Sequence, residues 1–231
     1  MQQSRDGHIT TARNPERRPI GSLRLTDRVP FIACWSMETT VQPEVTMRRG
    51  RLAYLNERPW DRDSDGILWR RSPSIPGKGK PQYGKVHFLR QRRAMQALLC
   101  QVCGRPASKD ATDSGLLWLL SEDPDDISTW PADLVTGHPP VCLSCAWVSV
   151  QACPHLRKQY AAVRVRRFGL SGVHGVLYRP SHPVPVPHDV GGLDFGDRRM
   201  PWVQAAQLMM RLEDFRLVDL EAEYRAHGQG C

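Results

Sequence analysis

The sequence predicts an α+β protein, and three features lead to that prediction. Short apolar runs rich in β-branched and aromatic residues are separated by turn residues, which is typical of strands. Residues 88–99 place apolar side chains on one face among arginines, as in an amphipathic helix. Two Cys-x-x-Cys pairs stand near the middle of the chain, with 38 residues between them. We therefore expect a cysteine-centred core with β-hairpins on both sides and a helix at the C-terminal end.

The composition excludes several classes of protein. The chain has 231 residues, a net charge of +8 and 40% apolar residues, enough to bury a core in one larger domain or two small ones. No apolar stretch approaches the roughly 18 residues that a membrane-spanning helix needs, so no membrane partner is expected. The N-terminus lacks the apolar segment of a secretory signal, which predicts a cytoplasmic location. Because the cytosol keeps thiols reduced, the seven cysteines need an explanation other than disulfides.

Changes in composition divide the chain into four parts. Residues 1–28 are arginine-rich and aperiodic, as in a flexible basic arm. Residues 29–86 form a β-rich N-terminal part with an exposed loop, rich in Pro, Gly and Lys, at 72–85. Residues 87–160 contain the predicted helix and both cysteine pairs. Residues 161–231 form the C-terminal part.

The C-terminal part contains four predicted elements. Alternating apolar and polar residues around a Gly and Ser turn predict a β-hairpin over 161–179. The proline-rich segment 179–189 predicts an extended connector. Apolar residues recur at helical spacing over 201–215, so we expect an amphipathic helix there. A second short helix is expected over 220–228.

The two cysteine pairs predict a zinc site. Each Cys-x-x-Cys turn presents two sulfurs at a separation that suits one metal ion, and tetrahedral Zn²⁺ accepts four such soft ligands. Gly104 follows the first pair, where a residue that tolerates positive φ is needed. The predicted ligands are Cys100, Cys103, Cys142 and Cys145. With all four positions filled by protein, the zinc would be structural and would contribute on the order of 10 kcal/mol to folding.

Other interpretations of this region stay open. A redox dithiol of the thioredoxin type needs one pair placed after a strand in a βαβ unit, which the loop-rich, arginine-rich sequence around both pairs does not favour. Cys153, His155 and His138 are close to the pairs in sequence and are candidate substitute ligands. A buried free thiol is the simpler interpretation of Cys153.

The central region resembles a known family. The order of RRAMQALLCQVCG, an apolar strand pair and PPVCLSCAW leading into a helix looks like a treble-clef zinc finger, and its opening is similar to that of HNH-type nuclease domains. The resemblance covers roughly residues 88–160 and implies the fold and the four zinc ligands. That family carries its general-base histidine between the cysteine pairs, where this chain has DSGLLWLL and no histidine before His138. The resemblance therefore does not extend to phosphodiester cleavage, which needs that base and an open metal position.

Arginines cluster near both cysteine pairs. If the zinc brings these segments together, they form a cationic surface of the kind that binds phosphates. The candidate nucleic-acid-binding residues are Arg90, Arg92, Arg93, Arg157, Lys158, Arg164, Arg166 and Arg167, with Lys78, Lys80 and Lys85 in the loop. In the predicted hairpin, Arg164 and Arg166 face outward. Composition offers another explanation, because 27 arginines against 5 lysines also fit a GC-rich genome and a surface coat that only solubilises the protein.

Two further patterns have simpler explanations. Residues 61–65 place aspartates at alternating positions, as in the first half of a calcium loop, but Ser72 stands where a bidentate Glu is expected. An acidic turn before a strand is therefore favoured. The apolar face of residues 201–215 is core by default, although such a helix can also dock on another protein.

These observations predict one function and leave two alternatives. The first is a non-enzymatic, zinc-stabilised protein that contacts nucleic acid through its arginines. One alternative is a protein-interaction or assembly subunit that uses the C-terminal helix. The other is a divergent HNH-type nuclease, which would need a second metal near Asp110, Asp113 or His138.

Overall fold

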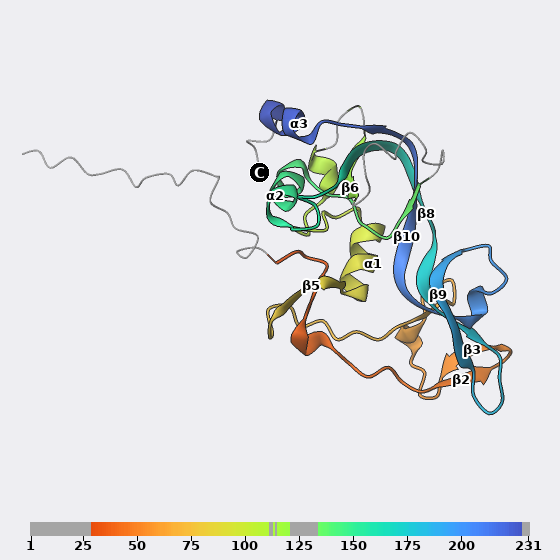
Figure 1. Cartoon of the computed structure of the whole chain (residues 1–231). Coiled ribbons are helices and arrows are strands. Elements are labelled where there is room, and N and C mark those ends of the chain that lie inside the picture. Colours follow the sequence, from red (N-terminus) through yellow and green to blue (C-terminus); the bar gives the residue numbers. More distant parts are fainter. Residues whose placement is uncertain (1–28, 111–112, 114, 121–133, 228–231) are drawn as a thin grey trace, which may run out of the picture.

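The computed structural model describes residues 29–110, 113, 115–120 and 134–227, and the predicted arm over 1–28 lies outside these residues. In the described part, a six-stranded curved sheet is combined with three α-helices and two small sheets (Figure 1). The α+β class predicted from the sequence is confirmed.

Two long antiparallel strands form the centre of the large sheet. They are β8 (Ala161–Arg179) and β10 (Val203–Leu217), which pair along nearly their whole length with register shifts after Ala205 and Met209. Irregularities of this kind bend and twist a strand. Figure 1 shows both strands curving around α1 (Phe88–Gln96).

Four short strands extend the two edges of this central pair. Their bounds are β4 (Leu68–Trp69), β6 (Leu116–Leu120), β7 (Leu134–Thr136) and β9 (Val186–Asp194). β6 pairs with the first part of β8 and β9 with its last part, while β4 and β7 pair with the beginning and the middle of β10. β4 belongs to the predicted N-terminal part of the chain, so that part shares a sheet with the C-terminal part.

The other described strands form two small antiparallel sheets. β1 (Ala33–Trp35) pairs with β5 (Pro81–Val86), and β2 (Val45–Arg48) pairs with β3 (Arg51–Tyr54). The β-rich character expected of the N-terminal part is therefore present. The loop predicted over 72–85 ends sooner than expected, where β5 begins.

Three of the four predicted helices are present. Residues 88–99 contain α1, and the short C-terminal helix is α3 (Leu220–His227). The cysteine region leads into α2 (Leu143–Ala152). Among the described residues, no helix has the length and apolar character needed to cross a membrane. Short 3-10 helices lie at Ser36–Glu38, Pro59–Asp61, Ala107–Asp110 and Met200–Trp202.

β6 separates the two main hydrophobic clusters. All five of its residues are buried, with Leu116, Trp118 and Leu120 on one face and Leu117 and Leu119 on the other. The first face packs with α1 and the inner residues of β8 and β10, and the second packs with the cysteines, α2 and α3. Since successive strand residues point to opposite faces, this unbroken apolar run suits a strand that is covered on both sides.

The hairpin predicted over 161–179 is wrong, because β8 continues through the Gly and Ser segment as one strand of 19 residues. Its glycines allow close strand packing instead of a turn. A Cβ on Gly172 would lie 2.0 Å from the carbonyl oxygen of Leu193 in β9, and one on Gly175 would lie 2.3 Å from that of Gln204 in β10. Glycine is the residue that tolerates such an approach within a strand.

The helix predicted over 201–215 is also wrong, because this segment forms β10. Leu208, Met210 and Leu212 enter the core with the strand period of two. The local sequence favours a helix, but hydrogen bonds to strands on both sides outweigh that weak preference. The apolar face that suggested a docking helix therefore belongs to the core of the sheet.

The proline-rich connector becomes an edge strand. Residues 182–184 form a bend, and the chain then enters β9, in which Pro187 lies opposite Tyr178 of β8. Within the described sheet, β9 pairs with β8 alone, so one of its sides needs no backbone donors. Proline is tolerated in such an edge strand. The expected extended conformation is confirmed from Val186 onward.

A buried ion pair joins the N-terminal part to α1. Arg90 donates hydrogen bonds of 2.6 and 2.7 Å to the carboxylate of Glu38, and both side chains are almost fully buried. The carboxylate also accepts the backbone N–H groups of Trp35 and Ile75. Arg90 donates in addition to two backbone carbonyls at and before β1. This pair therefore holds β1, the following 3-10 helix and α1 together.

These contacts set the pKa of Glu38. Burial by itself raises the pKa, but the hydrogen bonds from Arg90 and from two backbone amides outweigh burial and lower it to about 2. The carboxyl group is thus easier to deprotonate in the folded chain than in the unfolded chain. The ion pair stabilises the fold at neutral pH, and this contribution is lost as the pH falls from about 4.5 towards 2.

We predict that Glu38→Gln lowers the free energy of unfolding by about 3 to 5 kcal/mol at pH 7, because it leaves Arg90 buried without a counter-charge. Urea unfolding followed by circular dichroism measures the difference. The difference should shrink as the pH falls from about 4.5 to about 2, because the wild-type carboxyl is then neutral as well. Glu44→Gln, at an exposed position, is the control and should change stability by less than about 0.5 kcal/mol. Equal stability of Glu38→Gln and Glu44→Gln at pH 7 would contradict this role of Glu38.

Candidate metal centre and basic surface

The two cysteine pairs lie next to the end of α1 and the start of α2. Cys100 follows α1 after Leu98, which has a left-handed backbone (φ 49°). The chain then turns so that the N–H of Gly104, with φ 70°, donates to the carbonyl of Cys100 at 2.8 Å. Cys142 directly precedes α2, and Cys145 lies in its first turn. A turn and a helix start thus aim both pairs at one point.

The four predicted ligands converge. The Sγ atoms of Cys100, Cys103, Cys142 and Cys145 all lie within 4.8 Å of one another, and those of Cys103 and Cys142 are 3.8 Å apart. Tetrahedral zinc with Zn–S bonds of about 2.3 Å places its sulfurs about 3.8 Å apart. The cluster therefore fits one zinc ion with four sulfur ligands.

The surroundings of the cluster suit a structural metal. Cys100, Cys142 and Cys145 are buried, Cys103 is half-buried, and the cluster packs against Leu117 of β6. The hydrogen bond with Cys100 lowers the pKa of Cys103 to about 6, and the same contact raises the pKa of Cys100. Zinc binds thiolates, so the ion would displace the remaining thiol protons. Four protein sulfurs leave no open position for a substrate.

Cys153, His155 and His138 do not join the cluster. In the part of the chain that the structure describes, the four cysteines are the one group of three or more metal-ligating side chains close enough to share an ion. Cys153 caps the end of α2, where its N–H donates to the carbonyl of Ser149. The backbone carbonyl of His138 accepts a 3.1 Å hydrogen bond from the indole of Trp118.

The aspartates before β4 serve local structure. Asp63 accepts the backbone N–H of Ile67 and, at 2.7 Å, the indole N–H of Trp69. Asp61 is buried and pairs with Arg71 at 2.6 Å. The preferred interpretation, an acidic turn before a strand, agrees with these contacts.

Two of the predicted surface cations are buried. Arg90 is 6% exposed and lies in the ion pair with Glu38. Arg164 is 2% exposed, and its guanidinium donates to Glu223 of α3 at 2.7 Å. The expectation that Arg90 and Arg164 face solvent is therefore wrong. The alternation of apolar and polar residues correctly predicted that Arg164 points away from the core face of β8. It did not predict that α3 covers the opposite face of the strand.

The other predicted cations reach solvent. Arg92 is half-buried, with its guanidinium 4.5 Å from the ring centroid of Trp69. Arg167 is exposed and lies 3.5 Å from Glu213, a separation that contributes little at a surface. The exposed members of the predicted set are Arg93, Arg157, Lys158, Arg166 and Arg167, and the loop adds Lys78, Lys80 and Lys85.

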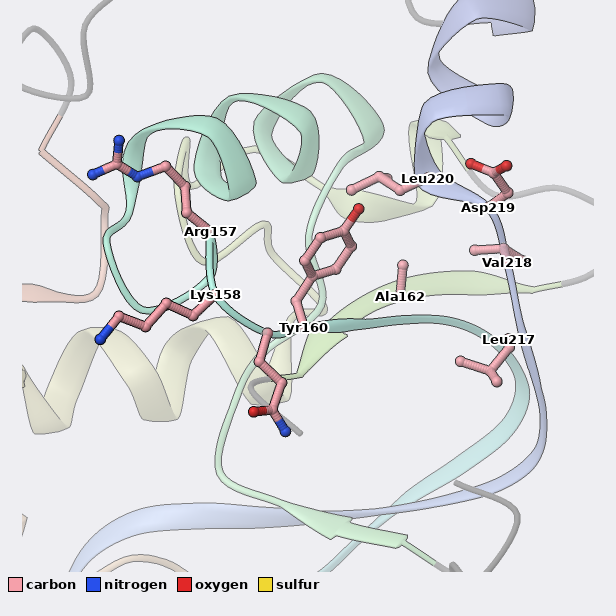
Figure 2. A pocket seen from close by; sticks show the side chains of 9 residues that line it. Arg157, Lys158, Tyr160, Ala162, Leu217, Val218, Asp219 and Leu220 are labelled. Carbon is pink, nitrogen blue, oxygen red and sulfur yellow. The ribbon is translucent and has the colours of Figure 1, made fainter. Parts of the chain in front are cut away.

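An open pocket of about 570 Å³ lies beside two of these cations. Figure 2 shows Arg157 and Lys158 at one side of it, on the segment after α2, and Asp219 at the other side, before α3. Tyr160 stands between them and packs against the cysteine-containing cluster, and burial, followed by the charge of Asp219, raises its pKa. The two cations extend away from this carboxylate and are accessible to an anionic partner.

A second pocket, of about 320 Å³, was not predicted from the sequence. It is lined by residues within 34–42, 70–72 and 82–88, and by Gln207 of β10. No local motif marks it, because these segments are distant in sequence and meet only in the folded chain. The basic residues at 70, 71 and 85 are the sequence feature that could have indicated this pocket. Nothing in the sequence distinguishes them from other surface cations.

Comparison with protein-family models, with curated proteins and with solved structures finds no match for this chain. The resemblance to treble-clef proteins therefore depends on the cysteine pairs and on the helix that follows the second pair. Between the pairs, β6 pairs with β8 and β7 pairs with β10, so the two described strands do not form a hairpin with each other. Asp113, one of the candidates for a second metal, is exposed and belongs to no ligand cluster among the described residues.

We predict that the purified protein contains one zinc ion per chain, bound by the four cysteines. Cys142→Ser should lose the metal and unfold at a lower temperature, because a structural zinc contributes on the order of 10 kcal/mol to folding. Atomic emission measures the zinc content, and calorimetry measures the melting temperature. Cys153→Ser is the matched control and should keep both values. Stoichiometric zinc in Cys142→Ser would contradict the assignment.

Proposed function

We propose that this chain is a non-enzymatic nucleic-acid-binding protein whose basic surface is held in place by a structural zinc of treble-clef type. The zinc would supply folding energy and rigidity, not reactivity. The observation that carries the proposal is the distribution of charge around the two segments that contribute the cysteines.

Both cysteine-bearing segments lack carboxylates. Residues 66–109 contain ten lysines and arginines and no Asp or Glu, and residues 134–188 contain six and none. Together they supply α1, both cysteine pairs, α2 and β8. A protein surface coated with arginine only for solubility usually intersperses both signs of charge. A long acid-free stretch instead produces the positive potential that attracts phosphates.

The contacts within the chain divide the predicted cations into two groups. Arg90 and Arg164 are neutralised by Glu38 and Glu223 and position elements of the fold. The exposed cations are left to bind phosphate. The proposed footprint is therefore Arg93, Arg157, Lys158, Arg166 and Arg167, with Arg92 held against Trp69 at its border.

Such a footprint would act mainly on the phosphate backbone. Guanidinium groups donate paired hydrogen bonds to phosphate oxygens and release condensed counterions on binding. Because the cluster joins the end of α1 to the start of α2, Arg93 and the pair Arg157 and Lys158 would have a fixed spacing. These cations would therefore contact phosphates and position the protein on the nucleic acid. No residue is assigned to reading the bases.

The two alternatives have less support. A protein-interaction role through a helix at 201–215 loses its basis, since that segment is a core strand, and α3 is docked on α2 through Leu220 and through stacking of Trp147 on Tyr224. A divergent nuclease would need a metal ion with an open position. Among the described residues, the four-cysteine cluster is the one group of side chains placed to share an ion, and its four sulfurs would fill all positions of a tetrahedral zinc.

We predict that zinc-loaded protein binds a generic DNA duplex with a log-log salt slope of about −4 or steeper, since each phosphate contact contributes about −0.9. Fluorescence anisotropy between about 50 and 300 mM salt measures it. Arg157→Gln/Lys158→Gln should weaken binding and make the slope shallower by about 2.

Arg198→Gln/Arg225→Gln is the matched control, because it removes the same charge at exposed positions outside the footprint. The control double variant should keep the slope of the wild type. No binding at the lowest salt, to duplex or single strand, would refute the proposed function. Equal effects of the two double variants would show that net charge alone, and not this surface, is responsible.

A further inference from the structure

The second pocket differs from the basic surface because five segments of the chain meet around it. Its wall includes Cys34 of β1, Arg70 beside β4, Lys85 of β5, Phe88 at the start of α1 and Gln207 of β10. A volume of about 320 Å³ is in the range of sites for small ligands. The small β1–β5 sheet and β10 of the large sheet therefore both contribute to the wall of this open pocket.

The charges that line the pocket do not balance. Glu38 contributes the carboxylate there, and it is fully occupied by Arg90 and two backbone amides. Arg71 is paired with Asp61. Lys85 and Arg70 remain, and no carboxylate of the described residues forms an ion pair with either of them. The wall thus carries two positive charges without counter-charges.

Of the two cations, Arg70 gives the stronger indication of a bound ligand. Its guanidinium carbon lies over the ring of Phe88, 5.2 Å from the centroid, in a cation–π contact that uses none of its N–H donors. Its Nε–H is buried and has no hydrogen-bond acceptor in the described part of the chain. A buried donor without an acceptor destabilises a fold by about 1 to 3 kcal/mol. The Nη groups of Arg70 also make no hydrogen bond within the described part of the chain, and they are the donors left for a ligand oxygen in the pocket.

From this geometry we infer that the pocket binds a small anion through phosphate or carboxylate oxygens, with Arg70 as the principal donor and Lys85 as the second positive charge. The planar guanidinium is suited to two oxygens of one group, and Lys85 lines the same pocket as a point charge. Neutral partners for the rest of a ligand are present in Gln207 and Thr39. This site is separate from the proposed nucleic-acid footprint and does not depend on it.

Cys34 provides an internal reporter of occupancy. Its thiol is half-buried and lines the same pocket, whereas Cys153 is half-buried at the end of α2 and does not line it. A ligand that fills the pocket would shield Cys34 from an alkylating reagent and leave Cys153 unaffected. Burial raises the pKa of the Cys34 thiol, so alkylation is best followed at mildly alkaline pH.

The test uses the full zinc-loaded chain and two probes, inorganic pyrophosphate and malonate, up to about 10 mM. Calorimetry gives the affinity, and peptide mapping after iodoacetamide treatment gives the alkylation of Cys34 and Cys153. We expect one of the probes to bind and to protect Cys34 selectively. Tighter binding of pyrophosphate identifies a phosphate ligand, and tighter binding of malonate identifies a carboxylate ligand.

Variants distinguish binding in this pocket from a general attraction of anions to the positively charged protein. Arg70→Gln and Lys85→Gln should each weaken binding by about tenfold or more, since each removes a charge-assisted contact. Lys85 is exposed, so its variant is expected to fold even if Arg70→Gln does not. Arg157→Gln/Lys158→Gln should bind the probe as the wild type does, which distinguishes this site from the nucleic-acid surface. The inference is overturned if neither probe binds, or if Lys85→Gln binds the probe as tightly as the wild type.

Discussion

The pairing of β8 with β10 is the constraint on which the rest of the structure depends. The two strands share thirteen register positions, and every other strand of the large sheet is attached to one of them. Their curvature provides a concave side for α1, and β6 at one edge separates the core around α1 from the core around the cysteines. The cysteine region and the N-terminal part are therefore attached, through β6, β7 and β4, to a frame supplied by the last third of the chain.

Arginine has two roles in this frame. Inside, Arg90 and Arg164 each bind a carboxylate from a distant segment, and these ion pairs hold β1 to α1 and α3 to β8. A buried pair of this kind contributes little net stability against an apolar replacement, but losing one partner is strongly destabilising, so it favours one arrangement over others. Outside, the cations that remain belong to segments without any carboxylate of their own. The same residue type therefore fixes the fold and gives its surface a positive field.

The proposed functions use these two features differently. The four converging cysteines join the end of α1 to the start of α2, and a bound zinc would hold the exposed cations at a fixed spacing. Such a spacing favours a partner with a regular array of phosphates. The pocket between the small and large sheets is lined by the half-buried Arg70 and by Lys85, and neither has a carboxylate partner among the described residues, which favours a small anion.

The sequence alone was sufficient to predict the α+β class, α1, the short terminal helix and the four converging cysteines. Helix amphipathicity and the spacing of metal ligands can be recognised in contiguous residues. Tertiary structure alone decided that residues 201–215 form a strand, since pairing on both sides overrides local helix preference. It also decided that Gly172 and Gly175 serve strand packing and not a turn, because only neighbouring backbones show the close approach. Whether an arginine is a surface cation or half of a buried pair depends on a carboxylate about fifty residues away, as for Arg90 with Glu38 and Arg164 with Glu223, and no local pattern contains that information.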